Sequence, residues 1–449
     1  MTTDRPNVLL VHCHDLGQYL GCYGADIETP EIDALADSGT LFENHFVTAP
    51  QCSPSRGSLM TGRHPHVNGL MGLAHGSWEL HDDEQIMPRY FGANGYETHL
   101  FGLQHITQDT DRLGYDYVHS EGNLYPGVSP GVHQANRARN VADVVTTFLE
   151  RDTGETPFFA SVGFFELHRV EEENGRFGFD PDFYETPDPD DVRPLPYLPD
   201  RRGVRRDLAE MHGMVTAIDD AIGTLTDCLE ETGLDAETIV VFTTEHGIAF
   251  PRAKGSCYDA GIEGVLIWSG PEIEAGQRRE ELVSNVDVFP TLLEFTDCDP
   301  PEVEFQGRSF EPLLRGESAA YEPRTQVFAE MTWHDMYNPV RAIRTDRYKY
   351  IRNFWHLPKV YLTKDIFASE SGREVREEYG VPPRPYEELY DIYEDPQETN
   401  NVVFEPRYQE IRLDLSERLE TWLRETEDPL LEGPVPAGDA DEVEAWPHR

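Results

Sequence analysis

The chain has 449 residues, and its 84 acidic and 37 basic residues give a formal net charge of −47 at pH 7. This charge argues against nucleic acid and against anionic membrane surfaces as partners, because both are bound through clusters of Lys and Arg. The length is sufficient for a large hydrophobic core and for about two domains.

The spread of the acidic residues bears on the compartment. They occur along the whole chain, which indicates a folded surface under strong self-repulsion. We expect a salt-rich cytoplasm, as in an extreme halophile, where salt screens this repulsion. The sequence shows no signal-peptide pattern and no run near the ~18 apolar residues of a membrane span. Its six cysteines are too irregularly spaced for a disulfide scaffold. We therefore expect a cytoplasmic protein with no membrane partner.

Strand patterns alternate with helical patterns in the first part of the chain. The apolar run at residues 7–12 predicts a strand buried on both faces. Residues 29–36 predict a helix with Thr29 as its cap and Pro30 at its first position. Helical spacing of apolar residues over 211–229 predicts a helix that packs on the sheet. Further buried strands, the last two of parallel type, are predicted at residues 95–105, 157–164, 238–244 and 264–268. This alternation predicts an α/β fold with a mostly parallel sheet sandwiched by helices.

The pattern changes in the last third of the chain. Residues 340–352 alternate around a turn, as a hairpin does, residues 388–393 predict a strand, and residues 411–422 an amphipathic helix. We predict a catalytic α/β domain over residues 1–318. A smaller C-terminal domain, with an antiparallel sheet plus helix, is predicted over residues 319–449.

Two segments are predicted to form no regular elements. Residues 170–205 are rich in Pro, Asp and Tyr, which predicts a long surface loop at the substrate rim. The tail from Pro429 onward contains Gly, Pro and acidic residues, and we expect it to be draped or loose.

The segment over residues 50–63 carries the strongest functional signal. It reads Cys52-Ser53-Pro54-Ser55-Arg56, followed by Leu59 and by Thr61-Gly62-Arg63. This order places the cysteine at a turn that leads into the N-terminus of a helix, where free N–H groups and the helix dipole attract anions. The simpler interpretation is a buried or reactive cysteine that stays unmodified.

Polar side chains follow two of the predicted strands. His14 and Asp15 come directly after the first strand, and Glu245 and His246 come directly after the strand at 238–244. Strand ends of one parallel sheet converge, so we expect these four residues to lie beside Cys52. Two carboxylates and two imidazoles are a ligand set for a divalent metal ion. The alternative is that either histidine only caps its strand.

The cysteine segment resembles the signature of the sulfatase family, in which this cysteine is oxidised after translation to formylglycine. The resemblance spans most of the chain, and it looks most like the heparan N-sulfatase (sulfamidase) branch. It implies an alkaline-phosphatase-like fold and a formylglycine-generating maturation enzyme as a partner. Besides the cysteine segment, it is carried, in this order, by residues 65–73, 165–169, 247–251, 388–391 and 395–400.

The resemblance also implies roles for single residues. One hydroxyl of the hydrated aldehyde at residue 52 attacks sulfur, and loss of the proton from the other expels sulfate. Arg56 would hold the nucleophile or the sulfate oxygens, and Lys254 would bind sulfate. His168 would protonate the leaving group, and His105 would assist breakdown of the sulfated hydrate. Without the resemblance, Lys254 reads as a surface cation and His105 as a core residue.

Three positions depart from the family pattern. His14-Asp15 stands where the family has paired aspartates, and Glu245-His246 stands where it has Asp followed by Asn or His. The metal is therefore left open: calcium by family, or manganese or zinc, because imidazole favours transition metals. Leu103 replaces a family lysine two residues before His105, which removes a cation beside the sulfate.

The sequence thus predicts a metal-dependent sulfatase that acts on a sulfate ester or sulfamate of a small, sugar-like substrate. Cleavage of S–O and of S–N bonds both stay open, because leaving-group specificity depends on the pocket. A phosphomonoesterase or phosphonate hydrolase of the same superfamily is one alternative. A catalytically degenerate, sulfatase-like binding protein is the other, since Leu103 and the metal ligands are altered.

Overall fold

A central sheet organises the larger part of the molecule. The computed structural model describes residues 5–119, 134–152, 154–299, 302–356, 358–380 and 383–437. Within these residues, the sheet has eight strands in the order β11-β2-β10-β9-β1-β6-β4-β5. The strands are β1 (Asn7–Cys13), β2 (Thr40–Phe42), β4 (Glu97–Gly102), β5 (Tyr117–Val118), β6 (Phe158–Gly163), β9 (Thr238–Thr244), β10 (Leu266–Ser269) and β11 (Gln277–Arg279).

The middle of this sheet is parallel, as the sequence predicts. Strand β1 pairs in parallel with β6 and β9, and Leu9 lies opposite Ala160 on one side and Val240 on the other. All residues of these three strands are buried. Strands covered on both faces need continuous apolar runs, which is why their patterns are recognisable in the sequence.

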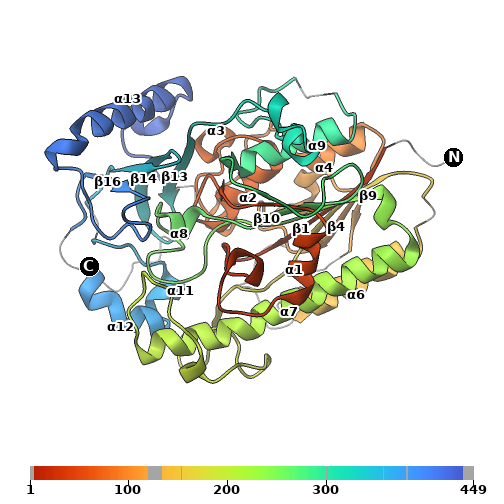
Figure 1. Cartoon of the computed structure of the whole chain (residues 1–449), viewed down its shortest axis with the longest axis horizontal. Coiled ribbons are helices and arrows are strands. Elements are labelled where there is room, and N and C mark those ends of the chain that lie inside the picture. Colours follow the sequence, from red (N-terminus) through yellow and green to blue (C-terminus); the bar gives the residue numbers. More distant parts are fainter. Residues whose placement is uncertain are drawn as a thin grey trace.

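Helices cover both faces of the sheet. On β1, Leu9 and Val11 belong to one hydrophobic cluster, whereas Val8 and Leu10 belong to a second one on the other face. The first cluster includes residues of α1 (Pro30–Asp37), α6 (Ala138–Leu149) and α7 (Arg202–Thr232). The second includes residues of α2 (Cys52–Thr61), α4 (Met87–Ala93) and α9 (Val288–Phe295). The α/β sandwich is thus confirmed, and Figure 1 shows both helical layers.

Strand β10 runs opposite to the predicted direction. The sequence pattern of residues 264–268 predicts a parallel strand, but Leu266 pairs with Thr243 of β9 in an antiparallel ladder. A parallel return needs a crossover along the full length of the sheet. Between β9 and β10 the chain forms only loops and the one-turn helix α8 (Asp259–Ile262), so it re-enters the sheet from the same end.

The predicted cap position of α1 is confirmed, but the Thr29 side chain makes no capping hydrogen bond to the helix. Thr29 occupies the cap position, but its hydroxyl donates to Asp33 at 2.9 Å and accepts from the Gly21 N–H at 2.9 Å. The N–H group of Ile32, in the first turn of the helix, instead donates to Asp219 of α7 at 2.8 Å. A carboxylate from a distant helix therefore replaces the local cap.

The segment at residues 170–205 is only partly a loop. Strands β7 (Val170–Glu171) and β8 (Phe177–Gly178) form a hairpin, and α7 already begins at Arg202. The buried Arg176 fixes this hairpin, because its guanidinium lies 3.0 Å from Glu210 of α7. Composition alone does not show such a tertiary ion pair, so the prediction of one continuous loop was wrong.

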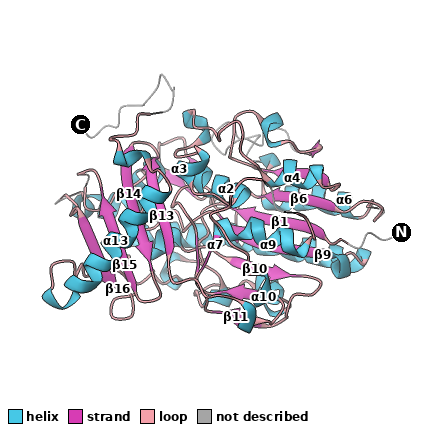
Figure 2. Cartoon of the chain, turned by 90° about the horizontal axis from the view of Figure 1, so that it is seen from above, coloured by secondary structure: helices cyan, strands magenta, loops and turns pink. Residues whose placement is uncertain are grey.

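The C-terminal part contains the predicted antiparallel sheet and helix (Figure 2). Ile343, Tyr350 and Leu389 on one face of the sheet cluster with Leu415 and Leu419 of α13 (Gln409–Glu425). Residues of the other face pack on the larger α/β part. Helix α12 (Glu370–Tyr379) also contacts α7, so the domain boundary at residue 318 stays a prediction. The four strands are β13 (Val327–Trp333), β14 (Tyr337–Arg344), β15 (Tyr348–Asn353) and β16 (Glu387–Asp391).

The tail is ordered further than predicted. Residues Pro429–Leu431 form a 3-10 turn, and the carbonyl of Val435 accepts a hydrogen bond from the Trp333 indole at 3.0 Å. Of the two expectations, the tail is thus draped on the protein rather than loose up to residue 437, and residues 438–449 lie outside the described part. None of the described helices is both long enough and apolar enough to cross a bilayer.

A buried ionic cluster joins the C-terminal sheet to the cysteine-bearing part. His66 Nδ1 lies 2.6 Å from Glu330, and Arg341 contacts Glu330 at 3.2 Å and Asp428 at 2.5 Å. The side chains of all four residues are fully buried or nearly so. Burial would raise the pKa of Glu330, but His66 and Arg341 lower it to about 2. The cation is therefore essential, because it compensates two buried carboxylates.

Replacing Arg341 by methionine removes this compensation. We expect Arg341→Met to lower the free energy of unfolding by about 3–5 kcal/mol at neutral pH, as measured by urea denaturation. The loss should shrink as pH falls from about 4.5 through about 2, because Glu330 is protonated first in the unfolded state and then, near pH 2, in the folded wild type. Arg418→Met, which breaks the exposed pair with Asp414, is the control and should cost under about 1 kcal/mol. Equal losses in the two variants would contradict this account.

Candidate active site

The predicted ligand residues meet at the carboxyl edge of the parallel sheet. Strand β1 ends at Cys13, which lies opposite Thr244 at the end of β9. His14-Asp15 and Glu245-His246 therefore leave the sheet side by side. The two following turns touch: the Gly17 N–H donates to the His246 carbonyl at 2.9 Å. Gly17 has φ +57°, and an added Cβ would meet Gly247 Cα at 3.1 Å, so only glycine fits there without strain.

Cys52 joins this group as the first residue of α2. Its sulfur lies 3.4 Å from His246 Nε2, which in turn lies 3.2 Å from Asp15. His14 Nδ1 lies 2.7 Å from Glu245. One possible ligand atom from each of His14, Asp15, Cys52 and Glu245 lies within 4.8 Å of the others. The structure thus brings together all five residues predicted from the sequence, and each of them is at most 2% exposed.

The chemistry of these donors fits a divalent cation. His14 Nε2 is buried and has no hydrogen-bond partner among the described residues, and Asp15 Oδ1 is also buried, 3.2 Å from His246 Nε2. Burial and then Arg56 lower the pKa of His14 well below its usual value, so its imidazole is neutral and able to ligate. Burial also lowers the pKa of His246. Mixed nitrogen and oxygen donors favour a transition metal over calcium.

Arg56 is committed to neighbouring protein groups. Its guanidinium donates to Glu245 at 2.8 Å and lies 2.5 Å from Nδ1 of His12. Burial would raise the pKa of Glu245, but Arg56 and His246 lower it, so the carboxylate is ionised. His12 was missed from the sequence because it belongs to the buried run of β1. The sequence did contain one indication of its role, because His12 is a polar residue in an apolar run and lies two positions before His14.

Lys254 is buried rather than a surface cation. Its ammonium group lies 2.9 Å from Asp15 and 3.0 Å from Asp365, and the residue is 2% exposed. Burial would lower the pKa of Lys254, but the two carboxylates raise it well above its usual value. Asp365 lies in α11 (Lys364–Phe367) of the C-terminal part, and sequence reasoning missed it because it belongs to no motif.

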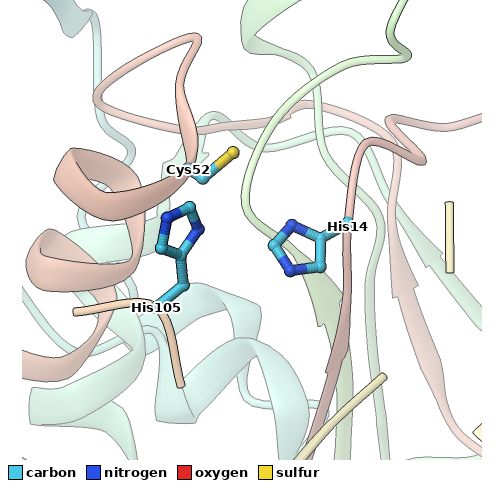
Figure 3. A group of neighbouring side chains, drawn as sticks. All are labelled: His14, Cys52 and His105. Carbon is cyan, nitrogen blue, oxygen red and sulfur yellow. The ribbon is translucent and has the colours of Figure 1, made fainter. Parts of the chain in front are cut away.

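Two further histidines follow strands β4 and β6 at the same edge. The ring centroid of His14 lies 5.8 Å from that of His105 and 5.4 Å from that of His168. Figure 3 shows the rings of His14 and His105 together with Cys52 at the start of α2. His168 Nδ1 donates to the Arg169 carbonyl at 2.7 Å, which leaves Nε2 for the site. Leu103 is fully buried in the hydrophobic core of the sheet.

Comparisons with known proteins agree with this geometry. Residues 6–298 match the family model described as Sulfatase, and residues 251–380 match the model described as N-sulphoglucosamine sulphohydrolase, C-terminal. Human N-sulphoglucosamine sulphohydrolase is 29% identical, in an alignment that covers 96% of this chain and 92% of the human protein.

Solved structures of low sequence identity share the fold. A 2-O GAG sulfatase superimposes with a TM-score of 0.73 at 22% identity and covers 97% of this chain and 95% of its own. The phosphonate monoester hydrolase of Agrobacterium radiobacter superimposes with a TM-score of 0.70 at 20% identity and covers 95% of this chain and 97% of its own. Because the first family model spans well over half of the 449 residues, the chain belongs to the sulfatase family.

Proposed function

We propose that this enzyme, a sulfuric ester or sulfamate hydrolase by family, uses a formylglycine hydrate made from Cys52 beside a bound divalent metal ion. The observation that carries the proposal is the convergence of Cys52, at the first turn of α2, with four buried metal-type ligands. A maturation enzyme that oxidises residue 52 is part of the proposal. The salt-rich cytoplasm also stays a prediction.

The environment of Cys52 favours its conversion over direct use of the thiol. Burial raises the pKa of the Cys52 thiol well above its ordinary value, so the sulfur is protonated at neutral pH. A protonated, buried thiol is a weak nucleophile. A hydrated aldehyde at the same position offers one hydroxyl for attack on sulfur and another whose deprotonation releases sulfate.

The metal would be held by His14, Asp15, Glu245 and His246. A divalent cation there supplies Lewis acidity that polarises a sulfate oxygen and favours ionisation of the hydrate. The four residues match this task because two are neutral imidazoles and Glu245 is ionised.

Protein cations and histidines complete the proposed reaction. An ammonium group has three N–H donors. Two donors of Lys254 go to Asp15 and Asp365, so one is left for a sulfate oxygen. His168 would protonate the leaving oxygen or nitrogen from Nε2, because Nδ1 donates to the Arg169 carbonyl. Burial lowers the pKa of His168, so the imidazolium that gives this proton has to form with the sulfated substrate bound. Arg56 would act mainly by keeping Glu245 ionised and in place.

The substrate is proposed to be a sulfated sugar. The human relative is by name a hydrolase of N-sulphoglucosamine, and a second family model of that name matches residues 251–380. We propose an amino sugar carrying an N-sulfate or O-sulfate group as the substrate class. A phosphonate or phosphate monoesterase is the second candidate, favoured by the fold shared with a phosphonate monoester hydrolase. Rates on matched sulfate and phosphate esters of one alcohol separate the two.

Mass spectrometry of the peptide containing residue 52 tests the nucleophile directly. In protein made in its native host, we expect the mass of a peptide in which an aldehyde replaces the thiol. Cys52→Ala should abolish hydrolysis of sulfate esters, whereas Cys228→Ala, in the buried face of α7, should leave it unchanged. Full activity in protein that carries only the unmodified thiol would exclude the proposed nucleophile.

Removing the metal tests the ligand set. Chelation with EDTA should lower activity, and manganese or zinc should restore it better than calcium, because two of the four ligands are imidazoles. His14→Asp should shift the ratio of manganese to calcium affinity toward calcium by roughly tenfold, as measured by titration calorimetry. The exposed His81 provides the control variant His81→Asp, which should keep the original ratio. An unchanged ratio in His14→Asp would contradict the assignment.

A pair of substrates tests the proton donor. His168→Ala should slow hydrolysis of a sugar sulfate or sulfamate by about 10²–10⁴-fold, because the leaving group then departs without a proton. The same variant should retain most activity on 4-nitrophenyl sulfate, whose leaving group needs no protonation. Comparable losses on both substrates would show that His168 acts in some other way.

A further inference from the structure

One histidine outside the predicted site lies directly against His105. Nδ1 of His75 is 3.2 Å from Nε2 of His105, and the two rings stack at 5.4 Å between centroids with an interplanar angle of 9°. Two imidazole nitrogens form a hydrogen bond only when one carries a proton and the other a lone pair. The contact therefore couples the tautomers of the two rings as well as their orientation.

The backbone at His105 needs such support. His105 has φ +50°, in the left-handed region that non-glycine residues seldom adopt. Conformations of this kind persist only when surrounding groups hold them. The Gln104 side chain fixes the turn by accepting from the N–H groups of Ile106 at 2.5 Å and Thr107 at 3.1 Å. His75 contacts the ring itself.

The turn that carries His75 is tied to the cysteine segment. His75 lies in the 3-10 turn Ala74–Gly76, and the Ala74 N–H donates to the hydroxyl of Ser53 at 3.0 Å. The Ala74 carbonyl accepts from the Gln108 side chain at 3.0 Å. The residue next to Cys52 thus anchors the turn from which His75 reaches His105. Ser53 of the cysteine segment therefore helps to fix the position of the turn that carries His75.

His105 faces residue 52 with its other side. One ring nitrogen of His105 lies within 4.8 Å of both the Cys52 sulfur and a ring nitrogen of His14. Because Nε2 is engaged with His75, we take Nδ1 as the ring nitrogen on the side of residue 52. Nδ1 accepts a proton only in the tautomer that carries hydrogen on Nε2. Nδ1 of His75 selects this tautomer when it accepts that hydrogen.

We propose that His75 is a positioning residue that holds His105 in the Nε2–H tautomer for release of sulfate, which rests on the function proposed above. In that step the free hydroxyl of sulfated residue 52 gives its proton to Nδ1 of His105. The electron pair of the broken O–H bond forms the C=O bond of the aldehyde, the C–O bond to sulfate breaks, and sulfate leaves with the electron pair of that C–O bond. His105 is 1% exposed, whereas His75 reaches solvent and can be replaced without opening the core.

Kinetics of two His75 variants test the proposal. His75→Leu removes the acceptor, and His75→Asn keeps an amide oxygen near the position of Nδ1. With residue 52 verified as formylglycine and metal bound, we expect His75→Leu to lower kcat about 10–100-fold on 4-nitrophenyl sulfate. KM should fall in parallel, so that kcat/KM changes less than about twofold, because attack on sulfur is unaffected. Nitrophenol should then appear in a burst equal to the enzyme concentration, because only sulfate release is slowed. His75→Asn should recover most of the lost rate.

Three kinetic results would overturn the proposal: an unchanged kcat in His75→Leu, equal losses in both variants, or a raised KM at constant kcat. Nitrogen-15 shifts of the His105 ring test it independently of turnover, and Nε2 should be protonated in the wild type but mixed in His75→Leu. The same tautomer mixture in both proteins would also overturn it. An inactive wild type with the expected tautomer would instead count against the proposed function alone.

Discussion

The parallel pairing of β1 with β9 is the constraint on which the rest of the structure depends. Its register places Cys13 opposite Thr244, so the two residues that follow each strand emerge at one edge. The touching turns at Gly17 and Gly247 keep these ends together. A shift of one residue in this register would turn alternate side chains to the other face of the sheet. The positions of His14, Asp15, Glu245 and His246, the proposed metal ligands, follow from this ladder, and Cys52 and Lys254 contact them there.

The carboxyl edge of the sheet brings several buried charged side chains together, and each buried charge needs a partner of opposite charge within the protein. Arg56 and Lys254 are buried cations. Arg56 contacts Glu245 and His12, and Lys254 lies between two carboxylates. One of those carboxylates, Asp365, comes from the C-terminal part. That part therefore contributes to the electrostatics of the centre as well as to packing. The proposed binding of an anion by this strongly acidic chain relies on Lys254, whose charge is buried and barely screened.

Much of this arrangement could be predicted because its signals are local. Continuous apolar runs identify β1 and β9, and His14 or Glu245 is recognisable by its place directly after such a run. The features that the sequence did not predict depend on tertiary contacts. The direction of β10 depends on the path of a short connection, the cap of α1 comes from Asp219, and Asp365 enters from a distant helix. His75 lacked a pattern of its own, since its partner is defined only by the folded turn.

The central claim is that residue 52 and one metal ion share a single buried site. Anomalous diffraction from crystals of the native, metal-loaded protein measures this most directly. The account predicts one metal peak at coordination distance from His14, Asp15, Glu245 and His246, in contact with an oxidised residue 52. A peak elsewhere in the molecule, or a metal whose ligands exclude residue 52 from its neighbourhood, would contradict it.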